Sequence, residues 1–211
     1  MNMKKNLLPA LLLLSACATP NVAVNPRADF TAVKRVAVLS FGGQQGDLAA
    51  DLMTQSLLAR GADVVERQRL NAVMEEQRLT ASTAFDPATA KQLGRLLGVD
   101  ALFVGTVAES TPQASYIVSG AENARRTTVS QVSGGSVYSE GTVLGLPNSQ
   151  LLSTTANVSL VSRMVDVQTG SVLWAASMSY EGFDVSAAMN GITEAFARSL
   201  AQIWPGLIIQ R

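Results

Sequence analysis

The first half of the chain alternates apolar runs typical of strands with apolar positions at helical spacing. Residues 35–41 form a β-branched, apolar run that ends at glycine, which is typical of a buried strand followed by a turn. Residues 46–59 place alanine, leucine and methionine at helical spacing, and Gly61 stands where a helix C-cap is expected. The elements predicted on these grounds are strand 35–41, helix 46–59, strand 63–65, helix 70–77, helix 87–97 and strand 101–107.

The second half begins with a change of composition. Residues 111–155 are rich in Ser, Thr and Gly and show neither an apolar period nor charge pairing, so we expect no stable element there in an isolated monomer. Regular patterns return in two strands, 157–167 and 171–180, joined by a Thr-Gly turn as in a β-hairpin. A final amphipathic helix over 188–203 stops before Pro205.

Together these elements predict one α/β domain. The order β-α-β-α-α-β, followed by a hairpin and a helix, is typical of helices packed on a mixed β-sheet. The Ser/Thr/Gly-rich segment is then an insertion before the C-terminal β-hairpin and helix. The chain is long enough for such a domain to bury a sizeable core.

The N-terminus has the pattern of a lipoprotein export signal. Lys4 and Lys5 precede a leucine-rich run that is too short for a bilayer span, which takes roughly 20 residues. The run ends in Leu14-Ser15-Ala16-Cys17, which matches the bacterial lipobox and implies lipid addition at Cys17 with cleavage before it. Because more than one acyl chain makes attachment stable, we expect the mature protein to be anchored to a membrane without crossing it by a helix.

This signal divides the chain into three parts. Residues 1–16 are a lipoprotein signal peptide, residues 17–33 a lipid anchor and tether without any period, and residues 34–205 a periplasmic domain with the insertion 111–155. Ala18 follows the cysteine, where many lipoproteins kept at the inner membrane have Asp. By that resemblance the protein is lipid-anchored at the outer membrane and faces the periplasm. The tether reaches at most about 55 Å when fully extended.

Composition excludes several kinds of chemistry. The chain has 16 basic and 16 acidic residues, and removal of residues 1–16 leaves 14 basic against 16 acidic, a balance of −2 that offers no broad attraction to nucleic acid. There is no histidine, and the single cysteine is the expected lipidation site. Ser-His catalysis, Cys-His catalysis and histidine metal ligation are therefore excluded. We expect no enzymatic activity, no cofactor and no metal.

Three glycines lie between the first strand and the first helix, where a phosphate-binding loop would sit. Gly42, Gly43 and Gly46 depart from the spacing G-x-G-x-x-G, and no Lys-Ser or Lys-Thr follows them. A tight strand-to-helix turn that requires glycine is the favoured interpretation.

The acidic and aromatic candidates also have structural interpretations. Glu75 and Glu76 are adjacent, so they point about 100° apart on a helix and form part of a solvated face. Asp100 stands at the start of a strand, where an aspartate most often serves a turn or cap. Trp174 and Tyr180 share one face of the second hairpin strand with Val172, Ala176 and Met178, which predicts core packing.

Four segments together resemble the curli secretion-channel (CsgG-like) family of bacterial outer-membrane lipoproteins. They occur in family order behind the lipobox, and they include the valine-glutamate-arginine piece and the Leu-Gly-x-Leu-Leu-Gly-x-Asp-Ala piece. The segments are 36–41, 64–77, 93–107 and 165–173.

The resemblance implies a periplasmic α/β domain with a non-enzymatic role in export or assembly of extracellular or envelope material. In the family's channel members, subunits form a ring, and each gives two β-hairpins to a shared transmembrane pore. The first hairpin would fall within residues 111–155. For the second, only Gly182 to Asn190 are available, too few for a spanning pair, so the full pore is not expected.

Two functions stay open at this point. The first is an export or assembly lipoprotein that forms homo-oligomers or binds an envelope protein partner. The alternative is a periplasmic binding module that activates or scaffolds an envelope enzyme such as a peptidoglycan synthase. Such activators usually use a longer tether than residues 18–33 provide.

Overall fold

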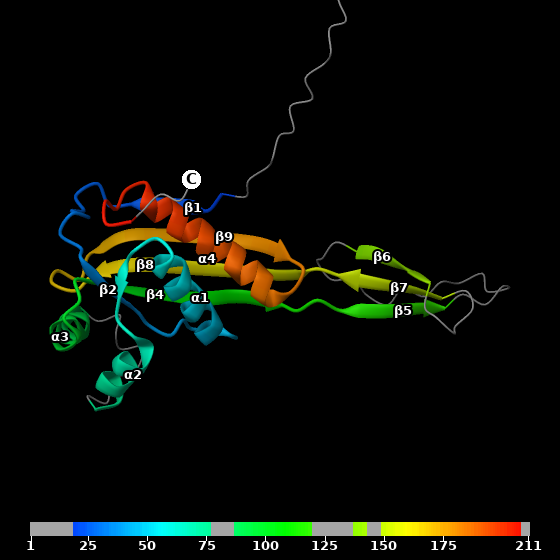
Figure 1. Ribbon diagram of the computed structural model, residues 1–211, viewed down its shortest axis with the longest axis horizontal. Coiled ribbons are helices and arrows are strands. Elements are labelled where there is room, and N and C mark those ends of the chain that lie inside the picture. Colours follow the sequence, from blue (N-terminus) through cyan, green and yellow to red (C-terminus); the bar gives the residue numbers. More distant parts are fainter. Residues whose placement is uncertain (1–18, 77–86, 120–136, 143–148, 208–211) are drawn as a thin grey trace, which may run out of the picture.

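A mixed sheet with helices on both faces forms the body of the molecule, and a second sheet projects from one end (Figure 1). The computed structural model describes residues 19–76, 87–119, 137–142 and 149–207. The helices are α1 (Gly46–Leu58), α2 (Arg67–Glu76), α3 (Pro87–Leu97) and α4 (Val185–Ala201). The strands are β1 (Asn21–Val24), β2 (Arg35–Val38), β3 (Asp63–Val64), β4 (Ala101–Thr111), β5 (Ser115–Ser119), β6 (Val137–Thr142), β7 (Ser149–Thr154), β8 (Ala156–Asp166) and β9 (Val172–Gly182).

The topology confirms the predicted α/β fold. The large sheet has the order β1-β9-β8-β4-β2-β3, in which β2 runs parallel to β3 and β4 while β4, β8 and β9 are antiparallel neighbours. The predicted hairpin is present as β8 and β9, with Gly170 in the left-handed conformation at its turn. Asp86, the expected N-cap of α3, and residue 77 lie outside the described residues.

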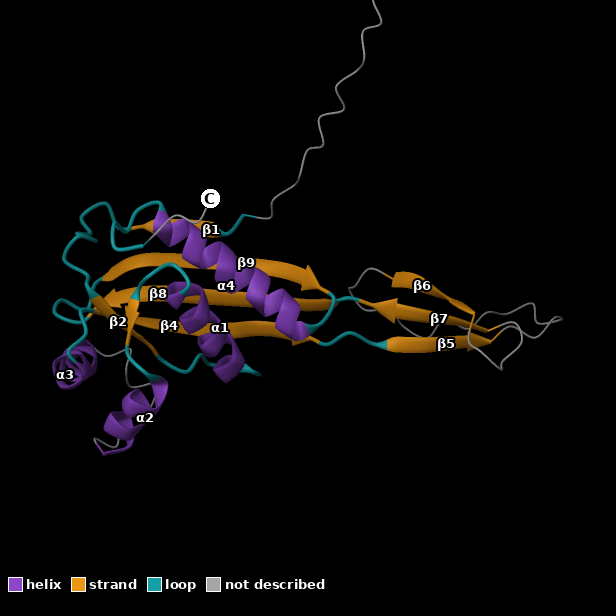
Figure 2. Cartoon of the chain, viewed as in Figure 1, coloured by secondary structure: helices purple, strands orange, loops and turns teal. Residues whose placement is uncertain are grey.

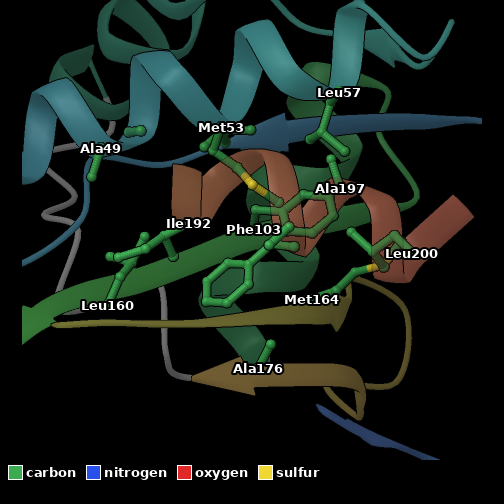
Figure 3. Packing of buried hydrophobic residues seen from close by; sticks show 14 of the residues in the cluster. Ala49, Met53, Leu57, Phe103, Leu160, Met164, Ala176, Ile192, Ala197 and Leu200 are labelled. Carbon is green, nitrogen blue, oxygen red and sulfur yellow. The ribbon is translucent and has the colours of Figure 1, made fainter. Parts of the chain in front are cut away.

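The larger core lies between α1, α4 and one face of the sheet. Met53 and Leu57 of α1 and Ile192 of α4 are fully buried against Phe103 and Leu160 of the strands (Figure 3). α4 can lie this close because its inward positions include small residues such as alanine. Burial of apolar surface at roughly 25 cal/mol per Å² makes this cluster the main source of stability.

A smaller core lies on the opposite face, under α2 and α3. Leu70 of α2 and Leu93 and Leu97 of α3 are buried against Leu102 and Val104 of β4. The apolar stripes predicted for both helices are therefore confirmed. The cartoon in Figure 2 shows that α2 and α3 lie together at the end opposite the projecting sheet.

The structure differs from the prediction of a tether over residues 17–33. Asn21 to Val24 form β1, which pairs antiparallel with β9 at the edge of the large sheet. Phe30 and Val33 are buried in the larger core. The sequence does not reveal this because a four-residue edge strand contains too few positions to show a period, and its partner lies about 150 residues away.

The expectation that residues 111–155 hold no stable element is wrong for the described part of that segment. β5, β7 and β6 form a three-stranded antiparallel sheet, here called the arm, which extends the hairpin of β4 and β8 beyond the body. Ala114 and Thr154 exchange hydrogen bonds at the joint, including a 2.8 Å contact from the backbone N of Thr154 to the carbonyl oxygen of Ala114. Backbone pairing between distant strands replaces the hydrophobic period that the segment lacks.

Candidate functional site

The expected lipidation site, Cys17, lies outside the described residues, but the structure fixes the direction in which the chain approaches the domain. Asn21 pairs with Ser177 and Val24 with Trp174, so β1 runs opposite to β9. The first residues of β1 therefore lie toward the end of β9. Gly182 at that end pairs with Ala156, the residue that begins β8 and follows the arm. The described chain thus enters β1 from the arm's side of the body (Figure 1).

The backbone geometry after β2 explains why glycine stands at each of the three positions 42, 43 and 46. Gly43 has φ +88°, and a Cβ there would lie 2.2 Å from the carbonyl oxygen of Val107. A Cβ on Gly46 would lie 1.8 Å from the carbonyl oxygen of Phe41. Gly42 donates to Gly105 at 2.9 Å and so continues the pairing of β2 with β4. The interpretation as a tight strand-to-helix turn agrees with this geometry.

Asp100 ties the start of β2 to the start of β4. One oxygen of its carboxylate, Oδ2, accepts hydrogen bonds from the backbone N–H groups of Lys34 at 2.8 Å and Arg35 at 3.0 Å. Its own N–H donates to the carbonyl oxygen of Arg35 at 2.8 Å. The predicted role as a turn or cap aspartate is confirmed. Glu75 and Glu76 are exposed on α2, as expected of a solvated face.

The aromatic pair of β9 divides between two environments. Trp174 is fully buried, with its ring edge-on to Phe103 and to Phe196 at centroid distances of 6.3 and 5.6 Å, so its predicted core role is confirmed. The prediction of core packing is wrong for Tyr180, which is 36% exposed and packs over Gly191 of α4 at the surface. It is also wrong for Val172, which is exposed because a register shift opposite Met164 and Val165 moves it off the inward face.

An ion pair between a buried arginine just after α1 and a half-buried glutamate of α4 links these two helices. Arg60, only 3% exposed, donates from Nη1 to Glu194 Oε2 at 3.0 Å and to the carbonyl oxygen of Ser56, while its Nη2 contacts Oε1 of the same carboxylate. The hydrogen bond from Arg60 holds the pKa of Glu194 below its ordinary value, against the opposing effect of partial burial. Ser56 also contacts Thr193 at 3.3 Å. This polar cluster fixes how the two helices lie on the sheet.

Part of the sheet face shared with α2 and α3 is covered by none of the described helices. Over β8 and β9 this open face is formed by small and polar side chains, and Ser159 and Ser179 lie 2.6 Å apart across it. Val161 at its centre is 40% exposed. The signal was available in the sequence as the alternation of Ser with apolar residues along both strands, but periodicity alone does not tell which face stays uncovered.

Among the strands that the structure describes, β5 and β6 form the two edges of the arm. β7 lies in its centre, and β5 and β6 each have one partner among the described strands. Such edges offer rows of backbone N–H and C=O groups to another strand, and natural proteins often protect them with lysine or proline. Neither β5 nor β6 contains either residue type.

The described residues contain neither a cluster of metal ligands nor a membrane-spanning helix. Among the described residues, no three histidine, cysteine, aspartate or glutamate side chains come together as a metal site would require. None of the helices in the described ranges has both the length and the apolar character to cross a bilayer.

Comparison with known proteins identifies one family. The model of the curli production assembly/transport component CsgG matches residues 15–196. This range covers most of the chain, starts inside the lipobox, and ends within α4. No curated protein matches the chain in a sequence search.

Solved structures with related shapes have low sequence identity. PelC from Paraburkholderia phytofirmans, solved as a dodecamer, is 14% identical over 83% of this chain and 93% of its own, with a TM-score of 0.45. The lipoprotein GNA1162 from Neisseria meningitidis is 15% identical over 81% of this chain and 98% of its own, with a TM-score of 0.47. The C-terminal domain of LpoB from Salmonella enterica is 14% identical over 72% of this chain and 84% of its own, with a TM-score of 0.41.

Proposed function

Because the chain belongs to the CsgG family of curli production assembly/transport components, we propose that it is a non-enzymatic outer-membrane lipoprotein that acts in export or assembly of extracellular or envelope material. The observation that carries this proposal is the family match over residues 15–196, which joins the lipobox to the folded domain in one unit. The fold supports it, since the large sheet, its helices and the arm follow in the order that the family segments have in the sequence.

Lipidation at Cys17 is the first part of the proposal. The motif Leu14-Ser15-Ala16-Cys17 follows a basic N-terminus and is the reason for it. The mass of the intact mature protein, purified from membranes, tests it directly: we expect an N-terminal Cys17 with added acyl chains. The matched control is Cys17→Ser, which should stay unprocessed and without lipid. A mature protein that begins at another residue contradicts this part.

Assembly of several copies through the arm is the second part. The outer edges of β5 and β6, which pair with no other described strand, give each arm two places to pair with strands of a neighbouring copy, one on each side. If the β5 edge of one copy pairs with the β6 edge of the next, the contact between copies is head-to-tail. Such contacts form a closed ring when the rotation that relates neighbouring copies adds up to a full turn. The partner of this surface is therefore another copy of the same chain.

Particle size in mild detergent tests this assembly. The comparison is between the full mature chain and a variant in which residues 112–156 are replaced by an Asn-Gly turn, which joins β4 to β8 directly at the paired residues Thr111 and Asn157. We expect large uniform particles for the full chain and a monomer for the variant, with the body folded in both. Particles of equal size show that the arm does not join the copies.

The absence of enzymatic activity is the third part. The mature chain has no histidine to activate a nucleophile, and Cys17 is reserved for lipid. The glycines near α1 and the carboxylate of Asp100 are used within the fold. The residues that most resembled catalytic candidates thus have structural roles.

The alternative, activation of an envelope enzyme at the inner membrane, is disfavoured by reach. Since β1 is fixed on β9, only three residues separate Cys17 from Asn21, and the four Cα-to-Cα steps between these two residues span at most about 14 Å. The body is therefore held close to the membrane that carries its lipid.

A further inference from the structure

A depression of about 500 Å³ lies between α3 and the turn that joins β8 to β9. Its volume falls within the range of ligand pockets in proteins, roughly 300–1,000 Å³. α3 contributes Lys91 and Arg95 to its lining, and the buried Val99 and Val167 contribute apolar groups. Cationic and apolar side chains are thus combined in one concave part of the surface.

Two glycines of α3 shape this depression. A Cβ on Gly94 would lie 2.5 Å from the Cβ of Val167, so α3 passes close to the turn between β8 and β9. Gly98 ends the helix with φ +65°, and a Cβ there would meet open space. The backbone N–H of Val99 donates to the carbonyl oxygen of Gly94 at 3.0 Å and fixes this end of the helix. The depression is therefore bordered by backbone that is held in place.

The two cationic side chains lie on the same face of α3. Lys91 and Arg95 are four residues apart in the helix, which places their Cβ atoms roughly 6 Å from each other. Both are exposed, and neither forms an ion pair with a carboxylate of the described residues. One anionic group can therefore contact both side chains, and an arginine guanidinium can bind a carboxylate through two parallel hydrogen bonds.

The carboxylates nearest to the depression are used within the fold. Asp100 also lines it, but its Oδ2 accepts hydrogen bonds from two backbone N–H groups at the start of β2, at 2.8 and 3.0 Å. Asp166 Oδ1 accepts from two backbone N–H groups of its own turn, at 2.9 and 2.6 Å. These bonds oppose any movement of the two carboxylates toward Lys91 or Arg95. Since two cations and one carboxylate line the depression, it favours an anion.

The apolar groups decide which kind of anion fits best. Val99 and Val167 belong to the smaller core and also line the depression. Inorganic phosphate has no apolar part that could cover them. A peptide segment with acidic and apolar side chains offers both a carboxylate for the cations and hydrocarbon for the two valines.

We propose that this depression binds an acidic segment of a protein partner, with a carboxylate between Lys91 and Arg95 and an apolar side chain against Val99 and Val167. Because both cations are exposed, the affinity falls as salt is added. The site belongs to the body and requires neither lipid at Cys17 nor pairing of the arm. It is therefore an addition to the role in export or assembly, and its test is independent of that role.

Binding of two short synthetic peptides to the mature chain in mild detergent tests this assignment. One peptide alternates glutamate with leucine, and its matched control has glutamine in place of glutamate. Fluorescence anisotropy of the labelled peptides at low salt should show binding of the acidic peptide and about tenfold weaker binding of the control. Lys91→Gln combined with Arg95→Gln should weaken binding of the acidic peptide about tenfold, because two exposed ion pairs are lost.

Two further variants separate this site from general electrostatic attraction. Arg27→Gln combined with Arg198→Gln changes the net charge equally at exposed positions that do not line the depression. This control should keep the affinity within about twofold. Gln168→Trp keeps every charge and fills part of the depression, so it should weaken binding. All five side chains are exposed, so the stability of the variants in urea should stay near that of the wild type.

Three results overturn the proposal. The first is no binding of the acidic peptide, or equal weakening in the two double variants. The second is unchanged affinity in Gln168→Trp, because the peptide then contacts the cations outside the depression. The third is displacement of the bound peptide by inorganic phosphate at equal concentration, which shows a site for small anions in place of a peptide.

Discussion

Leu97 gives a direct test of the smaller core. It is 1% exposed at the C-terminal end of α3 and packs with Leu93, Val99 and Leu102 against the sheet. Leu97→Ala removes buried apolar atoms and leaves a cavity between α3 and β4. The loss of both the transfer free energy and the packing contacts should destabilise the protein.

The size of the stability loss depends on how far the neighbours of Leu97 can move into the cavity that the substitution leaves. Leucine-to-alanine changes in cores cost about 2–5 kcal/mol, with the larger values where neighbours cannot move into the cavity. A Cβ on Gly94 would lie 2.5 Å from the Cβ of Val167, so α3 already touches this part of the body and has little room to shift inward. We therefore expect a loss of about 3–4 kcal/mol in the free energy of unfolding.

Urea unfolding of the mature chain measures this loss as a shift of the midpoint at constant slope. Leu96→Ala is the matched control, because Leu96 is the next residue on the same helix and is 46% exposed. Its cost should stay within about 0.5 kcal/mol. Equal losses for the two variants, or a loss below about 1 kcal/mol for Leu97→Ala, would refute the packing described for α3.

Two further variants test local features. Because Arg60 lowers the pKa of Glu194 below its ordinary value of 4.5, the carboxylate stabilises fully above that value and loses its effect as the pH falls below it. From about pH 7 to about pH 3, the stability of the wild type should approach that of Glu194→Gln, and a constant difference contradicts the ion pair's role. A Cβ at Gly98 would meet open space, so Gly98→Ala introduces only the strain of an alanine at positive φ. This strain should lower the free energy of unfolding by about 1–2 kcal/mol. In Gly46→Ala the new Cβ meets the carbonyl oxygen of Phe41, so this change should lower the free energy of unfolding clearly more in the same urea unfolding assay; equal losses for the two variants would contradict that contact.

Several features of this protein were readable in the sequence because they depend on local patterns. The apolar run at 35–41, the stripe of Leu93 and Leu97, and the Thr-Gly turn between β8 and β9 each give a period or a turn signal over a few residues. These signals were enough to predict helices on a mixed sheet. The lipobox likewise lies in consecutive residues and needs no fold to be recognised.

Other features were decided only by tertiary structure. β1 has no period of its own and exists because β9 offers an edge, and the arm is held by pairing between β5, β7 and β6. The burial of Trp174 and the exposure of Phe183 depend on whether α4 lies over the side chain. Sequence patterns state what a segment prefers locally, whereas strand partners and coverage come from residues far away in the chain.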